Sequence, residues 1–432
     1  MTTTMGVKIA VVGAGSTYTP ELVDGLATRA DRLPVDELAL LDIDGPRLEI
    51  VAGLAGRMLR RREWSGRLTT TLDRDAALDG ADFVVIQLRV GGQAARLVDE
   101  TLPLRFGCIG QETTGPGGFA KALRTVPVVL DIAETAARRA APGAWILDFT
   151  NPVGIVTQAL LDAGYRAVGL CNVAITLQRR IAAARGVAPE RVELEHVGLN
   201  HLTWERAVRV DGQDILPEML DDDVAAANLA AELELPVDLL RALRAIPSYY
   251  LRYFYRTSEV LAEERAGHTR AKEVMEIERG LLDLYRDPAL DVKPALLEKR
   301  GGAFYSEAAA QLMASLHAGT GDVQVVNVRN AGALPDLPAD DVVEVPARVD
   351  RDGAHPLPLQ PLAPEMRALV QHVKAYERLT VEAAISGDRT TALRALLSNP
   401  LVAEWDVALP LLDALLDANR DHLSRFFPVG RP

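Results

Sequence analysis

Long hydrophobic runs are missing from this sequence. No stretch of roughly 18 uncharged apolar residues occurs, although a membrane-spanning helix needs about that length. The first residues also lack the basic segment, the apolar core and the cleavage site of a secretion signal. We therefore expect a cytoplasmic protein that has no membrane partner.

Cysteine is nearly absent, since the 432 residues include 2 of them, Cys108 and Cys171. They could form at most one disulfide bond, and in a reducing compartment we expect free thiols instead. At least one cysteine is then available for chemistry.

Basic charge is in deficit, with 47 lysines and arginines against 60 acidic residues and a formal net charge of −13. No block rich in lysine or arginine is present, so nucleic acid is not an expected partner. A small anionic substrate would need a local cluster of arginines. The 48% hydrophobic content is that of a globular protein with room for two domains.

An apolar run that ends in glycine opens the chain. Val7 to Val12 is typical of a buried strand, and Gly13 and Gly15 would supply a tight turn with close backbone approach to a ligand. The third glycine of a dinucleotide-binding fingerprint is replaced by Tyr18. Despite this gap, the turn predicts a site for the pyrophosphate of a dinucleotide.

The residues after this turn support the same prediction. Thr19 is expected to cap the next helix, with Pro20 at its first position, and Ser16 and Thr17 lie where the cofactor would pass. Asp42 ends the second predicted strand, 38–44. An acidic residue there accepts hydrogen bonds from the adenosine ribose and disfavours a 2′-phosphate, so NAD is preferred over NADP.

Strand-like and helical patterns alternate from Val7 to about Cys171. Short apolar runs at 81–88, 144–150 and 166–171 are separated by helical spans. This alternation predicts an α/β fold with a Rossmann-like, doubly wound parallel sheet, in a domain of residues 1–195. Ligands of such sheets bind beyond the carboxyl ends of the strands.

The pattern changes in the second half of the chain. Segments 192–198 and 202–210, closed by Asp211 and Gly212, predict an antiparallel ribbon. The Pro-rich interval 335–364, with strand-like pieces such as 342–346, is expected to loop over the surface. Residues 196–432 are therefore expected to form an α+β substrate domain. Its predicted helical segments are 216–245, 257–290, 306–317, 365–386, 388–397 and 408–424.

Polar residues follow several of the predicted strands. Gly110 to Gly118 is a glycine-rich loop that permits close approach of a ligand, although such loops are often simple helix entries. Asn151 either presents an amide to a ligand near the strand ends or caps a helix. The local pattern favours neither interpretation.

Cys171 ends another strand, next to Asn172, and His201 lies between two strands. A structural zinc site would need four protein ligands at tighter spacing. One thiolate and one imidazole would suit a catalytic metal with open coordination positions. From spacing alone, a buried cysteine and a hydrogen-bonded histidine remain the favoured interpretation.

Aromatic residues make up 5% of the chain, yet segment 248–255 is rich in them. Most of these would be core residues, but a cation or an arginine beside Tyr250 would lower the pKa of its phenol and make it a base. Arg96 and Arg270 are candidates for holding a substrate anion through paired hydrogen bonds. Any single arginine is more often a solvated surface charge.

Taken together, these segments resemble the NAD- and metal-dependent glycoside hydrolases of family four, and within them the 6-phospho-β-glucosidases. The resemblance covers nearly the whole chain and implies an overall fold like that of lactate and malate dehydrogenases. One departure is Ala174, where the subgroup commonly has proline. The matching motifs are 13–20, 41–44, 109–118, 150–152, 171–173, 198–202, 250–253 and 300–306.

The resemblance implies roles for individual residues. Cys171 and His201 match the family's metal ligands, which usually bind manganese, and Tyr250 matches its catalytic base. Asn172 occupies the position whose residue type differs between substrate classes within the family. The substrate-binding residues implied are Arg96, Asn151, Asn172 and Arg270, with both arginines near the phosphate.

The implied reaction is the hydrolysis of a 6-phospho-β-glucoside. NAD oxidises the C3 hydroxyl to a ketone, which acidifies the proton on C2, and the metal stabilises the enolate formed when Tyr250 removes that proton. The aglycone then leaves from C1, water adds, and NADH returns the hydride to C3. The family resemblance also suggests a homodimer or homotetramer.

Two other functions fit parts of the sequence. The nucleotide-binding half alone would equally support an NAD-dependent 2-hydroxy-acid dehydrogenase of the lactate or malate type, which would form NADH in step with product. A non-catalytic NAD-binding regulator would tolerate loss of Tyr250 or His201.

Overall fold

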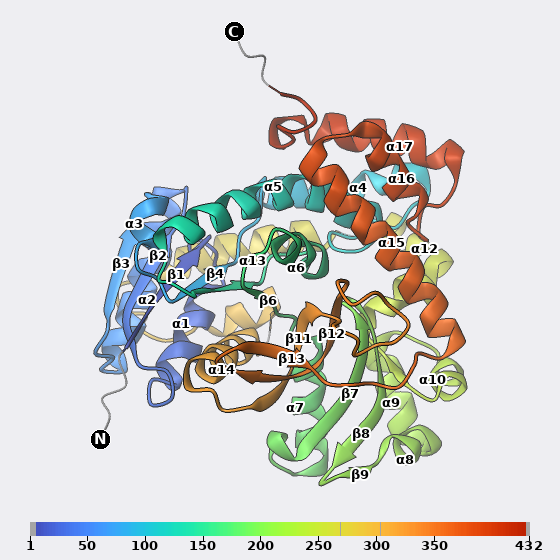
Figure 1. The fold of residues 1–432 in the computed structure, drawn as a ribbon, viewed down its shortest axis with the longest axis horizontal. Coiled ribbons are helices and arrows are strands. Elements are labelled where there is room, and N and C mark those ends of the chain that lie inside the picture. The colour runs from blue at the N-terminus through green and yellow to red at the C-terminus, as the bar shows by residue number, and fades with distance from the viewer. Residues whose placement is uncertain (1–5, 268, 303, 429–432) are drawn as a thin grey trace.

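The computed structural model describes residues 6–267, 269–302 and 304–428, so Ala303, in the last matching motif, lies outside the described residues. Its main element is a 9-stranded sheet with strand order β13-β12-β11-β6-β5-β4-β1-β2-β3 (Figure 1). The strands of the N-terminal half are parallel, as predicted for a Rossmann-like fold: β1 (Val7–Val12), β2 (Val35–Leu41), β3 (Arg67–Thr71), β4 (Phe83–Ile86), β5 (Trp145–Asp148) and β6 (Ala167–Gly169).

The C-terminal half of the chain extends this same sheet. Three strands join it in antiparallel orientation: β11 (Asp322–Arg329), β12 (Val342–Asp350) and β13 (Gly353–Pro356). The expectation that 335–364 loops over the surface is wrong for β12, because Val343 and Val345 are fully buried. An apolar run of this kind is stable where the sheet is covered on both faces.

Helices cover both faces of the large sheet. In Figure 1, α5 and α6 lie above it and pack on each other, whereas α1 and α14 pack together below it. The helices of the N-terminal half are α1 (Thr19–Thr28), α2 (Gly45–Arg61), α3 (Arg74–Leu78), α4 (Gly92–Thr101), α5 (Gly115–Arg139), α6 (Val153–Asp162) and α7 (Val173–Arg185). None of the helices in the described ranges is both long and apolar enough to cross a membrane.

A second, smaller sheet holds the predicted antiparallel ribbon. Its strands are β7 (Val192–Leu199), β8 (Leu202–Val210), β9 (Gln213–Asp214) and β10 (Ile246–Pro247). Asn200 and His201 form the tight turn between β7 and β8, with His201 at a φ of 63°. The division predicted between residues 195 and 196 falls inside β7 and stays a prediction.

The predicted helical segment 216–245 is three helices in the structure. Asp222 interrupts it and caps the second helix by accepting a hydrogen bond from the Ala225 N–H at 2.7 Å, and Pro236 precedes the third. Caps and prolines at these positions start new helices. The three helices are α8 (Leu216–Asp221), α9 (Asp223–Leu233) and α10 (Val237–Leu243).

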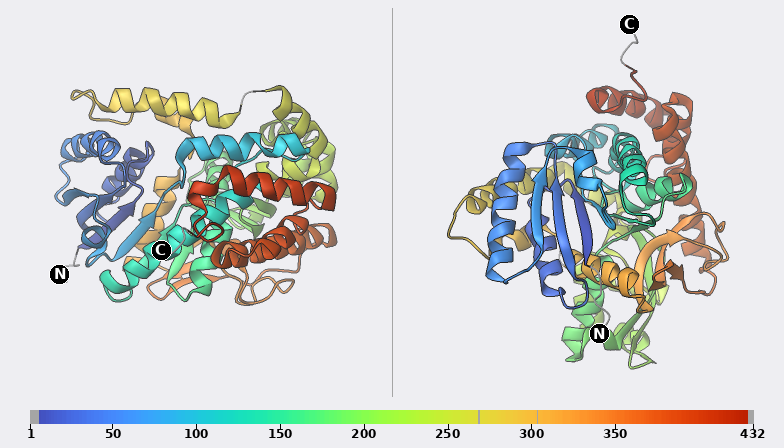
Figure 2. Two further views of the ribbon diagram at one scale, coloured as in Figure 1. Left: turned by 90° about the horizontal axis from the view of Figure 1, so that it is seen from above. Right: turned by 60° about the vertical axis from the view of Figure 1, so that its left-hand side comes forward.

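Four of the remaining helices lie at predicted segments, whereas the segment 257–290 is split in two and the short helix Arg252–Tyr255 was not predicted. Helix α13 packs against α2 and α4, and its yellow ribbon runs along the edge of the molecule in the left view of Figure 2. The helices are α11 (Arg252–Tyr255), α12 (Thr257–Ala266), α13 (Arg270–Tyr285), α14 (Tyr305–Ala318), α15 (Pro364–Ser386), α16 (Arg389–Leu397) and α17 (Trp405–Ala418).

The N-cap residue of α1 is Tyr18, so the prediction that Thr19 caps this helix is wrong. The Thr19 side chain points into the core instead, where its hydroxyl donates to the Ala14 carbonyl at 2.8 Å and accepts from Gln87 Nε2 at 2.8 Å. Thr19 therefore ties the glycine turn after β1 to the end of β4.

Candidate active site

A cavity of about 1580 Å³ runs from the glycine turn after β1 to the aromatic segment before α11. Parallel strands deliver its residues from their carboxyl ends, as the fold predicts. Thr17, Cys171 and His201 are not among its lining residues. The predicted site residues that do line it are Gly13, Gly15, Ser16, Asp42, Arg96, Asn151, Asn172, Tyr250 and Arg270.

The glycine turn leaves no room for side chains on its backbone. Gly13 has a φ of +86°, and a Cβ atom there would lie 2.7 Å from the Gln87 carbonyl oxygen. Asp42 fastens the turn, since its Oδ2 accepts a hydrogen bond from the Gly15 N–H at 2.7 Å and its Oδ1 accepts from the Ile43 N–H at 2.8 Å. A turn that lacks side chains and is held in place beside a large cavity is suited to binding a dinucleotide.

Two arginines that sequence reasoning missed flank this turn. Arg47 Nε donates to the Gly15 carbonyl at 2.6 Å, and Arg300 Nε donates to Thr17 Oγ1 at 3.2 Å. Glu278, on α13, holds both guanidinium groups, with N–O separations of 3.1 and 3.3 Å. Arg300 begins one of the sequence motifs, but no local pattern marks Glu278, which comes from a helix distant in sequence.

His201 is held in one tautomer by its neighbours. The Gln111 side-chain oxygen accepts from the Thr113 N–H at 2.5 Å and from the Thr113 hydroxyl at 2.9 Å. The Thr113 hydroxyl oxygen is therefore free to accept from His201 Nδ1, 3.0 Å away. Burial lowers the pKa of His201 to about 4, so the ring is neutral. Its Nε2 lone pair is thus the one offered to a metal.

Tyr250 lies directly against this histidine. The two rings are stacked, with centroids 3.7 Å apart and planes 11° apart. Burial raises the pKa of Tyr250 above its usual value, Cys171 and Glu112 raise it further, and Arg96 opposes them. The expected lowering of the phenol pKa is therefore not provided by the protein alone, and a nearby cation would have to supply it.

Cys171 lies just before the N-terminus of α7 and is 5% exposed. Hydrogen bonds from the Asn172 and Val173 N–H groups and from the Asn200 side chain favour its thiolate. Burial and the Glu344 carboxylate outweigh them and raise the pKa of the thiol well above its ordinary value. Cys171 and Cys108 are both free thiols, as predicted.

These residues fit a divalent metal with open coordination positions. Cys171 offers a thiol and His201 offers Nε2. The Asn151 Oδ1, a buried oxygen without a hydrogen-bond partner, is left for a substrate hydroxyl. No group of three or more histidine, cysteine, aspartate or glutamate side chains is placed to hold a metal within the ranges that the structure describes. A metal here would therefore keep positions for substrate oxygens.

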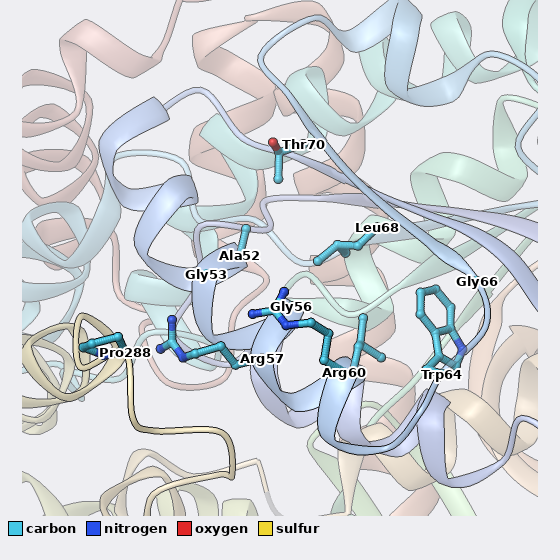
Figure 3. Close-up of a pocket in the computed structure, with 11 residues that line it drawn as sticks. Ala52, Gly53, Gly56, Arg57, Arg60, Trp64, Gly66, Leu68, Thr70 and Pro288 are labelled. Carbon is cyan, nitrogen blue, oxygen red and sulfur yellow. The ribbon is translucent and has the colours of Figure 1, made fainter.

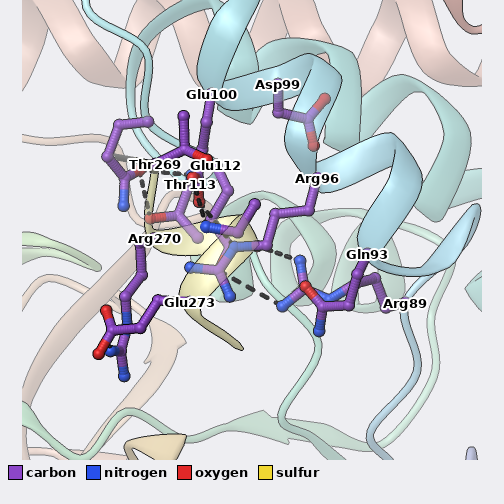
Figure 4. A network of polar contacts seen from close by, with 12 residues as sticks. Arg89, Gln93, Arg96, Asp99, Glu100, Glu112, Thr113, Thr269, Arg270 and Glu273 are labelled. Carbon is purple, nitrogen blue, oxygen red and sulfur yellow. Dashed lines mark hydrogen bonds and ion pairs between the residues drawn. The ribbon is translucent and has the colours of Figure 1, made fainter. Parts of the chain in front are cut away.

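Arg96 belongs to a buried ionic network (Figure 4). Glu112, in the glycine-rich loop, pairs with Arg89, with Arg96 at 3.2 Å and with Lys121 at 2.7 Å. Although burial opposes ionisation, these cations hold the pKa of Glu112 well below its usual value. Burial and the neighbouring Arg89 lower the pKa of Lys121 to about 7. Sequence reasoning noted the glycines of this loop and missed its polar side chains.

One carboxylate links Arg96 to the backbone at the start of α13, next to Arg270. Arg96 Nε donates to Glu100 Oε1 at 2.7 Å, and the Ala271 N–H donates to Glu100 Oε2 at 2.7 Å. Arg270, at the start of α13, pairs with Glu273 at 2.5 Å and donates to the Lys299 carbonyl at 2.7 Å (Figure 4). A buried arginine, Arg96, and an exposed one, Arg270, thus line the same cavity.

A separate cavity of about 610 Å³ lies beside α2 and β3 (Figure 3). Its ionisable lining residues are Arg57 and Arg60. The Arg57 guanidinium already donates hydrogen bonds to two backbone carbonyls, that of Leu290 at 2.5 Å and that of Tyr285 at 2.7 Å. No predicted site residue lies there, so the larger cavity is the candidate active site.

Comparison with protein families assigns both halves of the chain to one family. Residues 8–187 match the family 4 glycosyl hydrolases, and residues 196–402 match the family 4 glycosyl hydrolase C-terminal domain. The chain therefore belongs to glycosyl hydrolase family 4, and the resemblance predicted from its motifs is confirmed.

Its relatives carry more particular names. The chain is 43% identical to the "Probable 6-phospho-beta-glucosidase" of Bacillus subtilis (strain 168), over 98% of this chain and 99% of the relative. It is 38% identical to the 6-phospho-beta-glucosidase of Escherichia coli (strain K12), over 91% of each. A phospho-alpha-glucosidase of Clostridium acetobutylicum is 30% identical over 96% of this chain.

Solved structures share the whole fold. The 6-phospho-beta glucosidase from Thermotoga maritima, solved with manganese, NAD+ and glucose-6-phosphate, aligns with a TM-score of 0.90 at 36% identity, over 96% of this chain and 99% of that one. A lactate dehydrogenase aligns with a TM-score of 0.56 at 16% identity, over 88% of this chain. The latter similarity shows the fold alone and confirms the dehydrogenase-like architecture.

Proposed function

We propose that this chain is a 6-phospho-β-glucosidase that uses NAD and a divalent metal, manganese by preference. The observation that carries the proposal is Tyr250 stacked on a neutral, tautomer-fixed His201, at a cavity that also contains a dinucleotide-type turn. Relatives of 38% and 37% identity named 6-phospho-beta-glucosidases support the substrate class. The dehydrogenase alternative rests on the nucleotide-binding half alone.

The metal and the catalytic base adjoin each other in this proposal. Cys171 and His201 Nε2 hold the metal, and Tyr250 takes the proton from C2 of the sugar on its phenolic oxygen. When bound, NAD accepts a hydride from C3 and the metal supplies Lewis acidity beside C2 and C3. Burial raises the pKa of Tyr250. Once the Tyr250 phenolate has formed, it therefore binds a proton strongly.

The remaining predicted residues hold the two ligands. Arg96 and Arg270 bind the phosphate of the sugar, and the unpartnered Oδ1 of Asn151 accepts from a sugar hydroxyl. Asn172, at the start of α7, faces the same cavity. The proposed cofactor residues are Gly13, Gly15, Ser16, Thr17 and Asp42.

Three further features complete the proposal. The chain divides into an NAD-binding domain, 1–195, and a substrate-binding and oligomerisation domain, 196–432. It works in the cytoplasm as a homodimer or homotetramer. Light scattering coupled to size-exclusion chromatography measures the oligomer directly, and a monomeric mass would contradict that part.

The test is a panel of p-nitrophenyl glycosides, α and β, with and without a 6-phosphate, assayed with NAD and Mn²⁺. We expect turnover of the 6-phospho-β-glucoside that needs both cofactors and is slowed by deuterium at C2. Release of nitrophenol without accumulation of NADH is the expected signature. NADH that forms one-for-one with product would overturn the proposal in favour of a dehydrogenase.

A further inference from the structure

A buried polar cluster joins the two sheets behind the metal-ligand candidates. His196 and Glu205 come from β7 and β8 of the small sheet, while Asn327 and Glu344 come from β11 and β12 of the large sheet. His196 and Asn327 are fully buried, Glu344 is 1% exposed and Glu205 is 3% exposed. Strands β7 and β12 pack on each other, so the cluster fills the junction between them. Such groups are costly to bury unless they are paired.

His196 bridges the two carboxylates. Its Nδ1 lies 2.6 Å from Glu205 Oε1 and its Nε2 lies 3.0 Å from Glu344 Oε1. Both ring nitrogens can donate only in the imidazolium form. The two carboxylates outweigh burial and raise the pKa of His196 to about 10. Two glutamates and one imidazolium leave the cluster with one net negative charge.

The second oxygen of Glu344 reaches toward the active site. Glu344 Oε2 accepts from Asn327 Nδ2 at 2.9 Å and from Asn200 Nδ2 at 2.7 Å. Asn200 precedes His201 in the β7–β8 turn, and its side chain also hydrogen-bonds to the Cys171 sulfur. The Asn200 amide thus joins the Glu344 carboxylate to Cys171, one metal-ligand candidate. Asn200 is also the chain neighbour of His201, the other candidate.

The Glu344 carboxylate lies one hydrogen-bonded residue away from Cys171, because Asn200 Nδ2 donates to its Oε2 at 2.7 Å and the same side chain hydrogen-bonds to the Cys171 sulfur. Glu205 Oε1 contacts His196 on the other side of that ring. A buried negative charge this close to the ligand candidates favours a divalent cation beside them. Glu344 therefore differs from Glu205 in what it does to the site, although both bind the same histidine.

We propose that Glu344 is a positioning residue for the metal, which orients Cys171 through Asn200 and attracts the cation with its buried charge. This inference rests on the proposed metal site at Cys171 and His201. Partners of this kind, one step removed from the metal, commonly contribute about 10- to 100-fold to metal affinity. His196 is the support that keeps Glu344 ionised in the interior.

The test measures Mn²⁺ affinity rather than turnover. Free Mn²⁺ gives an electron paramagnetic resonance signal that disappears on binding, so the NAD-loaded enzyme can be titrated directly. We expect Glu344→Gln to weaken Mn²⁺ binding about 10- to 100-fold. The matched control is Glu205→Gln, which removes the opposite carboxylate from the same histidine without touching Asn200. It should retain wild-type Mn²⁺ affinity.

A purely structural role predicts a different pattern. Both variants would then lose stability and NAD affinity together, with equal changes in Mn²⁺ binding. Unchanged Mn²⁺ affinity in Glu344→Gln, or equal losses in both variants, overturns the inference. If Glu344→Gln does not fold, Asn200→Ser must show the weakened Mn²⁺ binding. A wild-type enzyme that binds no Mn²⁺ would instead overturn the proposed function itself.

Discussion

Thr113 shows how a single hydroxyl can fix the chemistry of a neighbouring ring. It donates to Gln111 and accepts from His201 Nδ1, which leaves Nε2 as the nitrogen that carries the lone pair. We expect Thr113→Val to weaken Mn²⁺ binding at least about tenfold, because the tautomer is no longer fixed. Thr113→Ser keeps the hydroxyl and should bind Mn²⁺ as wild type does. Equal losses in the two variants, measured by paramagnetic resonance titration, would contradict this account.

Tyr250 is the residue on which proton transfer depends. Removing its hydroxyl in Tyr250→Phe should lower kcat about 10²- to 10⁴-fold, the usual contribution of a positioned base. NAD and Mn²⁺ should still bind, since the aromatic ring remains against His201. Exchange of the C2 proton with deuterated solvent, followed by NMR, should disappear as well. The matched control is Tyr253→Phe, one turn further along the chain, and exchange that survives in Tyr250→Phe would exclude this base.

The residues that sequence reasoning found share one property, which is that a local pattern marks them. Cys171 and Asn151 follow apolar strands, and Tyr250 lies in an aromatic segment. Glu344 has only a weak local signal, as the charged residue within the apolar first part of β12, 342–346. Its partner Asn200 is 144 residues away in the chain, and only the folded sheet brings the two together.

At the scale of elements, the parallel strands were the most predictable part. Five of the six, β1, β2, β4, β5 and β6, are short, mostly buried apolar runs, so composition and length suffice to find them. The edge strand β3 (Arg67–Thr71) contains no buried residue and was not predicted. The bounds of the helices beyond 216 depended on caps such as Asp222, which an unbroken helical pattern concealed. The first part of β12 was predicted as a strand-like piece, 342–346, but the prolines of the interval 335–364 suggested a surface loop instead of a buried strand of the large sheet.

The junction between β7 and β12 should make stability depend on pH. The pKa of His196 is raised from 6.5 to about 10 by Glu205 and Glu344. The folded protein therefore keeps a proton that the unfolded chain releases between these values. The stabilisation from His196 is complete below pH 6.5 and is lost as pH rises through about 10.

This dependence can be measured by urea unfolding at several pH values between 6.5 and 10. We expect the free energy of unfolding of the wild type to fall over this interval, and the fall to be smaller in His196→Gln. A substitution of the exposed His355, paired with Asp350 at 3.1 Å, should leave the slope unchanged. Parallel slopes in the wild type and His196→Gln would contradict the assignment of an imidazolium.

The whole molecule is organised around a cavity to which both halves of the chain contribute. Residues from the glycine turn and from the segment after β10 line the same space. The large sheet is itself shared, since β11 to β13 come from the C-terminal half and β11 pairs with β6. Sequence reasoning located a division near residue 195 from the change in pattern, but a pattern along the chain cannot reveal strands that return to an earlier sheet.

Because the sheet and the cavity are shared, the two halves should unfold as one unit. NAD at one hundred times its Kd should raise the free energy of unfolding by about 2.7 kcal/mol in a single transition. Hydrogen exchange followed by mass spectrometry separates the halves: protection should increase in β2, beside the glycine turn, and equally in β8, in the small sheet. Protection confined to β2, or two transitions of which NAD shifts one, would show instead that the halves unfold independently.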